Sequence, residues 1–133
     1  MLLSKHHPVP RILLVEDSED TRELSRLTLE SQACEVAAVS TAEAALGLLR
    51  AGERYDLVFT DVCLGGVSGL EAAHLIQEHQ PGLPVLVTSG LQPAQVLPQL
   101  TTSMRFLPKP YSMSELLDAI RQGLDAPMLG HAA

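Results

Sequence analysis

The chain has 133 residues, 46% hydrophobic and 19% charged, which is enough to build one compact domain around a real core. Its 16 acidic and 9 basic residues give a net charge of −7, which argues against nucleic-acid binding through a basic surface. No apolar run reaches the roughly 18 residues of a membrane span, and no signal peptide is apparent. We therefore expect a cytoplasmic protein with reduced cysteines, a domain over residues 11–125, and flexible ends over 1–10 and 126–133.

Short apolar runs alternate with helix-like segments along the whole chain. The runs predict strands at 12–15, 34–39, 56–61, 85–88 and 106–107. Helices are predicted over 19–31, from 41 to about 50, over 70–79, weakly after Pro93 as far as Pro98, and after Ser112 to about 124. This alternation is typical of the α/β class, and it predicts a doubly wound, five-stranded parallel sheet with helices on both faces.

Helix starts and inward faces can be assigned locally. Ser18 is the predicted cap of the first helix, whose inward stripe is expected to hold Leu24, Leu27 and Thr28. Capping boxes are predicted where a serine is followed three residues later by glutamate. These are Ser40 with Glu43 and Ser112 with Glu115, and the last helix should turn Leu116, Leu117, Ile120 and Leu124 inward.

Polar residues stand at the ends of four predicted strands. They are Glu16 with Asp17, then Asp61, Thr88 and Lys109. Because ligands of parallel α/β sheets bind beyond the carboxyl ends of the strands, we expect these side chains to form one site. Three carboxylates would repel one another without a cation, so the pattern predicts a divalent metal beside a reactive aspartate.

The sequence motifs resemble those of a known family. ILLVED, LVFTD, a glycine-containing loop that ends in SGLE, PVLVTSG and FLPKPYS occur in the order found in receiver domains of two-component response regulators, which also occur fused to hybrid histidine kinases. The resemblance covers residues 11–125. It implies a flavodoxin-like (receiver-like) fold and a regulatory phosphoacceptor, a switch in a phosphorelay and not an enzyme.

The resemblance implies a role for each polar residue at the strand ends. Asp61 would accept a phosphoryl group from a phosphohistidine of a histidine kinase or histidine phosphotransfer protein. Mg²⁺ would be held by Glu16, Asp17, Asp61 and the backbone carbonyl of Cys63, oxygen donors of the kind that this ion prefers. Lys109 would pair with Asp61 and then with the phosphoryl group. In formal charge, three carboxylates balance Mg²⁺ and one lysine.

Other positions in the family pattern concern switching and lifetime. Thr88 matches the switch hydroxyl, and Phe106 stands where a switch aromatic is usual. A cis bond is implied between Lys109 and Pro110. Gly90, two residues past Thr88, cannot shield an acyl phosphate from water, so a short to moderate lifetime is expected. Gly65 and Gly66 should loosen the loop after the acceptor.

The implied partners are a kinase or phosphotransfer protein and an unknown downstream protein. Output is expected through the last two strands and helices, with the chain a monomer or a phosphorylation-dependent homodimer. No membrane or direct nucleic-acid contact is expected.

Simpler interpretations remain open from the residues alone. Asp61 could only cap the following helix, Thr88 could be an ordinary strand residue, Lys109 could be a solvated loop lysine, and Asp17 could bind metal without Glu16. A metal-dependent phosphohydrolase is an alternative, although Cys63 stands where a second acid would be expected. A receiver-like interaction module that is never phosphorylated is another. Cys63 itself is interpreted as a structural thiol.

Overall fold

The computed structural model describes residues 9–64 and 68–125, so the predictions for the outermost ends and for Gly65 and Gly66 lie outside the described residues. Strands and helices alternate along the chain. The strands are β1 (Arg11–Val15), β2 (Glu35–Val39), β3 (Leu57–Asp61), β4 (Val85–Ser89) and β5 (Met104–Pro108). The helices are α1 (Glu19–Glu30), α2 (Ala42–Arg50), α3 (Gly69–His79), α4 (Pro93–Val96), the 3-10 turn η1 (Leu97–Gln99) and α5 (Met113–Asp125).

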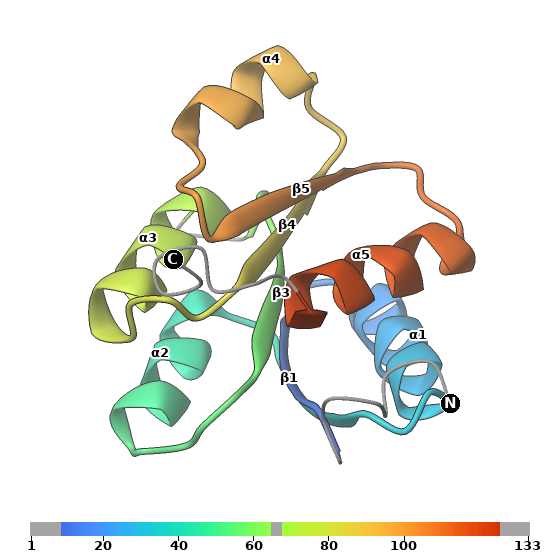
Figure 1. Cartoon of the computed structure of the whole chain (residues 1–133), viewed down its shortest axis with the longest axis vertical. Helices are drawn as coiled ribbons and strands as arrows, with labels where there is room; N and C mark the ends of the chain where they lie inside the picture. Colours follow the sequence, from blue (N-terminus) through green and yellow to red (C-terminus); the bar gives the residue numbers. More distant parts are fainter. Residues whose placement is uncertain (1–8, 65–67, 126–133) are drawn as a thin grey trace.

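The five strands form one parallel sheet in the order β2-β1-β3-β4-β5. Helices α1 and α5 cover one face, and α2 and α3 cover the other (Figure 1). This confirms the predicted doubly wound α/β architecture. Within the described residues, no helix is both long and apolar enough to cross a bilayer.

Alternation along the central strands divides the core into two layers. In β1, Leu13 and Val15 pack with α2 and α3, whereas Ile12 and Leu14 pack with α1 and α5. All of β3 and β4 is buried, as expected for inner strands of a sheet covered on both faces. The ends of these two strands are thereby fixed relative to each other, and they carry Asp61 and Thr88.

The predicted inward stripe of α1 is wrong in two of its three residues. Leu24 and Leu27 are 62% and 52% exposed, and the buried residues of α1 are Ser25, Thr28 and Leu29. Both sets have helical spacing, so periodicity alone could not choose between them. The buried face of α1 thus combines two small polar residues with Leu29, which lies in the core with residues of β1 and α5.

Helix caps were predicted with mixed success. Ser18 caps α1 as predicted, by accepting from the backbone of Thr21. The box predicted at Ser40 is wrong, because the neighbouring Thr41 caps α2 and accepts from the backbone of Ala44 at 3.0 Å. The second box is confirmed. Its two reciprocal bonds join the Ser112 amide to the Glu115 carboxylate at 2.8 Å and the Glu115 amide to the Ser112 hydroxyl at 3.0 Å.

The weak helix expected after Pro93 is a four-residue helix followed by the turn η1, which contains Pro98. Val96 is the buried residue of α4 and packs in a small cluster with Val62, Leu70 and Val87. Strand β5 is longer than the two residues predicted. The peptide bond between Lys109 and Pro110 is cis, as expected.

Candidate functional site

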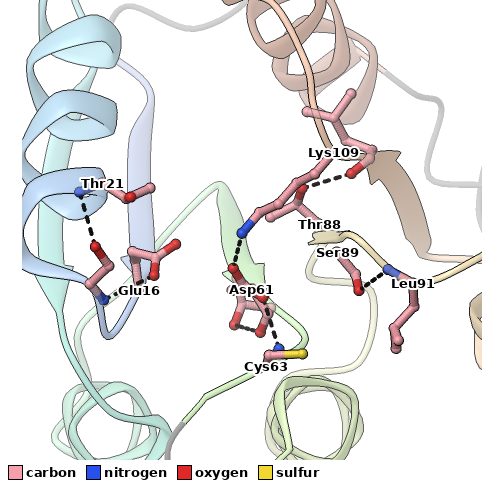
Figure 2. Close-up of polar contacts among 11 residues, drawn as sticks. Glu16, Thr21, Asp61, Cys63, Thr88, Ser89, Leu91 and Lys109 are labelled. Atoms are coloured by element: carbon pink, nitrogen blue, oxygen red, sulfur yellow. Dashed lines mark hydrogen bonds and ion pairs between the residues drawn. The ribbon is translucent and has the colours of Figure 1, made fainter.

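The parallel register brings the polar strand ends to one edge of the sheet. Val15, which precedes Glu16, is level with Thr60, and Asp61 is level with Thr88. Thr88 is level in turn with Leu107, two residues before Lys109. Figure 2 shows Glu16, Asp61, Thr88 and Lys109 around this edge. The juxtaposition predicted from the strand ends is therefore present.

Asp61 is the buried centre of the site, with 5% of its surface exposed. Its Oδ2 accepts from Lys109 Nζ at 2.5 Å, and its Oδ1 accepts from the backbone N–H of Cys63 at 2.8 Å (Figure 2). Partial burial acts to lower the pKa of Lys109, but the hydrogen bond and charge of Asp61 outweigh it and leave that pKa raised. Lys109 is thus an ammonium ion paired with the Asp61 carboxylate. The interpretation of Lys109 as a solvated loop lysine is wrong.

Glu16 is the second buried carboxylate, 6% exposed. Its Oε2 accepts from the backbone N–H of Ser18 at 3.0 Å. Burial raises the pKa of Glu16 and the charge of Asp61 raises it further, whereas the Ser18 amide and Lys109 lower it. Asp17 follows with an exposed side chain. Two buried acids therefore face one lysine, which leaves negative charge at the edge of the sheet.

The donor set fits a hard divalent cation. Carboxylate oxygens of Glu16, Asp17 and Asp61 and the carbonyl of Cys63 are the oxygen ligands that Mg²⁺ takes. Burial is the main cause of the raised pKa of Glu16 and the Asp61 charge adds to it, and a bound cation would favour the ionised form of this carboxyl group. Within the described residues, no three His, Cys, Asp or Glu side chains are arranged so that they could hold a metal ion together. In this arrangement Lys109 bonds to Oδ2 of Asp61.

The two predicted switch residues make different contacts: Thr88 bonds to β5, and Phe106, itself in β5, packs beside α4. Thr88 is buried, and its hydroxyl donates to the backbone carbonyl of Leu107 at 2.7 Å. Phe106 is half-buried and packs against the cluster that contains Val96 of α4. The Thr88 hydroxyl therefore bonds to the neighbouring strand and would have to leave this carbonyl in order to reach a group on Asp61.

Three residues that support the site were not singled out from the sequence for this role. The backbone of Gly69 lies so close to Asp61 that an added Cβ would be 1.8 Å from the Asp61 carbonyl oxygen. Arg22 donates to the backbone carbonyl of Glu16. Tyr111 packs edge-on against Phe59, with 6.3 Å between the ring centroids. The glycine in SGLE was a signal for the first, whereas the other two contacts join elements that local patterns do not connect.

The two cysteines differ in environment. Cys34 is buried, and burial raises the pKa of its thiol to about 11, which keeps it protonated. Cys63 is exposed. The backbone N–H of Cys63 contacts Asp61, and the interpretation of its side chain as a structural thiol stays a prediction.

Comparisons with known proteins show the family to which the chain belongs. The family model described as the response regulator receiver domain matches residues 12–121. The response regulator protein FleR of Pseudomonas aeruginosa is 37% identical over 112 residues, which cover 83% of this chain and 24% of FleR. The sensor histidine kinase AruS of the same species is 34% identical over 125 residues, which cover 89% of this chain and 12% of AruS. The chain thus spans about a quarter or less of these two relatives.

Solved structures give the same result. A response regulator receiver protein from Sinorhizobium medicae superposes with a TM-score of 0.82 at 27% identity, covering 89% of this chain and 96% of that one. The receiver domain of the hybrid histidine kinase CckA superposes with a TM-score of 0.74 at 28% identity, covering 86% and 99%. With the family model matching most of the chain, the chain belongs to the response regulator receiver domain family, the phosphoacceptor signalling domains of two-component systems.

Proposed function

We propose that Asp61 is the phosphoacceptor of this receiver domain and that its phosphorylation changes a surface recognised by a downstream protein. The observation that carries the proposal is the buried Asp61 carboxylate, held by Lys109 at the same sheet edge as Glu16 and Thr88. A carboxylate that only capped a helix would have no need of this lysine. The proposed donor is a phosphohistidine on a histidine kinase or histidine phosphotransfer protein.

In the proposed reaction, a carboxylate oxygen of Asp61 forms a bond to phosphorus while the phosphorus–nitrogen bond of phosphohistidine breaks. The imidazole nitrogen keeps the electron pair of that bond and later takes a proton from solvent. Since carboxylates are weak nucleophiles and the phosphoryl group is anionic, the site must work mainly by positioning and charge neutralisation. Lys109 would exchange its contact with Asp61 for one with a phosphoryl oxygen.

Glu16, Asp17, Asp61 and the Cys63 carbonyl would hold Mg²⁺, which when bound neutralises charge on the transferring phosphoryl group. The backbone N–H of Cys63 fixes the orientation of Asp61 through its bond to Oδ1. The same residues support self-catalysed phosphorylation by small donors, and self-catalysed loss of the phosphoryl group to water.

The switch is proposed to pass through Thr88. Its hydroxyl would leave the Leu107 carbonyl and donate to the phosphoryl group, which would free β5 and the Phe106 side chain to repack. The α4 segment is the natural element to respond, because it is short and is anchored by Val96 in the cluster beside Phe106. Downstream docking would then use the surface of β5, α4 and α5.

Phosphoramidate provides a direct test, because its reactive bond is the phosphorus–nitrogen bond of the proposed donor. The wild-type chain, Asp61→Asn and Lys109→Ala should be incubated with it in Mg²⁺ and analysed on a phosphate-affinity gel. We expect a shifted band for the wild type, no shifted band for Asp61→Asn, and much slower formation for Lys109→Ala. A shifted band of wild-type intensity in Asp61→Asn would contradict the assignment of Asp61.

A further inference from the structure

The segment between β1 and α1 is anchored to its surroundings on several sides at Glu16. The Glu16 backbone N–H donates to the carbonyl of Val39 in β2 at 3.1 Å. Its side chain accepts from the Ser18 amide. Its own carbonyl accepts from Nη1 of Arg22, in the first turn of α1, at 2.9 Å. Backbone and side chain of this buried acid are therefore fixed by separate bonds.

The hydrogen bond from Arg22 satisfies a backbone carbonyl that lies just beyond the end of β1. Strand β1 ends at Val15, so the carbonyl of Glu16 lies beyond the paired part of the sheet. A buried or half-buried carbonyl that lacks a donor costs free energy. Arg22 supplies that donor from α1. Its bond joins the residue that follows β1 to the first turn of the helix. The two residues held between these anchors are the acid pair, Glu16 and Asp17.

We infer that Arg22 is a positioning residue for the proposed metal ligands Glu16 and Asp17. It acts through the backbone of Glu16 and touches neither the metal nor the phosphoryl group. The inference rests on the proposed function, since it concerns Mg²⁺ binding at this edge of the sheet. Groups that orient metal ligands commonly change metal affinity by about 10- to 100-fold when they are removed.

The positive charge of Arg22 should weaken Mg²⁺ binding, whereas its positioning role should strengthen it. The direction in which Mg²⁺ affinity changes when Arg22 is removed therefore tests the inference. A cation near an acidic site repels Mg²⁺, so a purely electrostatic role predicts tighter Mg²⁺ binding when the arginine is removed. A positioning role predicts weaker binding. Arg26 supplies a matched control, because it lies one turn further along α1 and its guanidinium group bonds with the glutamates Glu23 and Glu30.

The experiment measures the Mg²⁺ dissociation constant of the unphosphorylated chain by NMR titration of backbone amides. We expect the constant to rise about tenfold in Arg22→Ala and to change less than about twofold in Arg26→Ala. Arg22→Lys keeps the charge and one donor, so its constant should lie between those of wild type and Arg22→Ala. Unchanged or tighter Mg²⁺ binding by Arg22→Ala would overturn the inference.

The experiment also distinguishes a variant that does not fold from a wild-type chain that does not bind Mg²⁺. If Arg22→Ala does not fold, Arg22→Lys decides at constant charge, since weaker Mg²⁺ binding supports positioning and unchanged binding overturns it. If the wild-type chain itself binds no Mg²⁺, both this inference and the metal site of the proposed function fail. A wild type that binds and an Arg22→Ala variant that binds equally well overturn the inference alone.

Discussion

Replacing Gly69 by alanine tests how the start of α3 is packed against β3, the strand that ends at Asp61. The alanine Cβ would lie 1.8 Å from the Asp61 carbonyl oxygen and 2.7 Å from the Val62 Cα. Since real contacts of this kind are at least 3.0 Å, the two backbones must separate by about 1.2 Å. Neither atom is at the end of a flexible side chain, so the strain cannot be relieved by a rotamer change.

The expected cost follows from overpacking a well-packed region, which destabilises by about 1–3 kcal/mol and sometimes more. Gly47 is the matched control, because it is exposed in α2 and an added Cβ there meets nothing within 4 Å. Alanine at this helix-interior position should stabilise the chain by up to about 1 kcal/mol. The two substitutions are chemically identical and are expected to act in opposite directions.

Urea denaturation measures both effects. With a slope near 2 kcal/mol per molar, Gly69→Ala should lower the midpoint by about 0.5–1.5 M, and Gly47→Ala should raise it by up to about 0.5 M. Displacement of the Asp61 backbone should also slow phosphorylation of folded Gly69→Ala. A Gly69→Ala variant as stable as Gly47→Ala would refute the close approach of α3 to Asp61.

Three other perturbations test the site. Thr88→Ala removes a buried hydroxyl bonded to a backbone carbonyl, so it should lower the free energy of unfolding by about 1 kcal/mol and abolish phosphorylation-dependent NMR shifts in β5; wild-type shifts in this variant would contradict the switch. Gly90→Glu introduces a side chain into open space beside the site and should slow release of inorganic phosphate from the phosphorylated chain, so faster release would contradict the shielding argument. Burial and the Asp61 charge raise the pKa of Glu16 above 4.5 in the folded chain, so the folded state binds this proton more tightly than the unfolded state does. The contribution of Glu16 to the free energy of unfolding therefore falls as the pH rises past 4.5. Glu16→Gln should therefore be more stable than wild type at pH 7 and lose that advantage below about pH 4 in denaturation experiments, and an equal advantage at both pH values would contradict the shift.

The sheet and the site edge could be predicted because both follow from short-range patterns. Each inner strand is a continuous apolar run, and a parallel sheet necessarily places the residues that follow such runs at one edge. Asp61 and Thr88 are thus neighbours by topology alone. The side-chain contacts of these residues could not be predicted from the sequence. The Thr88 hydroxyl points toward Leu107 because of a side-chain rotation that no sequence pattern encodes.

The cap of α2 and the inward face of α1 were predicted wrongly because, in each case, two neighbouring sets of residues fit the sequence pattern equally well. Ser40 and Thr41 are adjacent hydroxyl residues, and the entry direction of the chain into α2 selects the second. In α1, two stripes have helical spacing, and the stripe that is buried contains Ser25, Thr28 and the core residue Leu29. This orientation of α1 leaves the more hydrophobic Leu24 exposed, which composition alone would not suggest.

Phosphorylation of Asp61 can be measured as the intact mass of the chain after incubation with acetyl phosphate, with and without Mg²⁺, alongside Asp61→Asn. We expect a single phosphoryl adduct that requires Mg²⁺ and is absent from the variant. Asp61→Asn should be confirmed as folded by circular dichroism, since it replaces the buried partner of Lys109. A folded wild-type chain that gains no adduct under any condition, or an adduct that persists in Asp61→Asn, would contradict the claim that Asp61 is the phosphoacceptor.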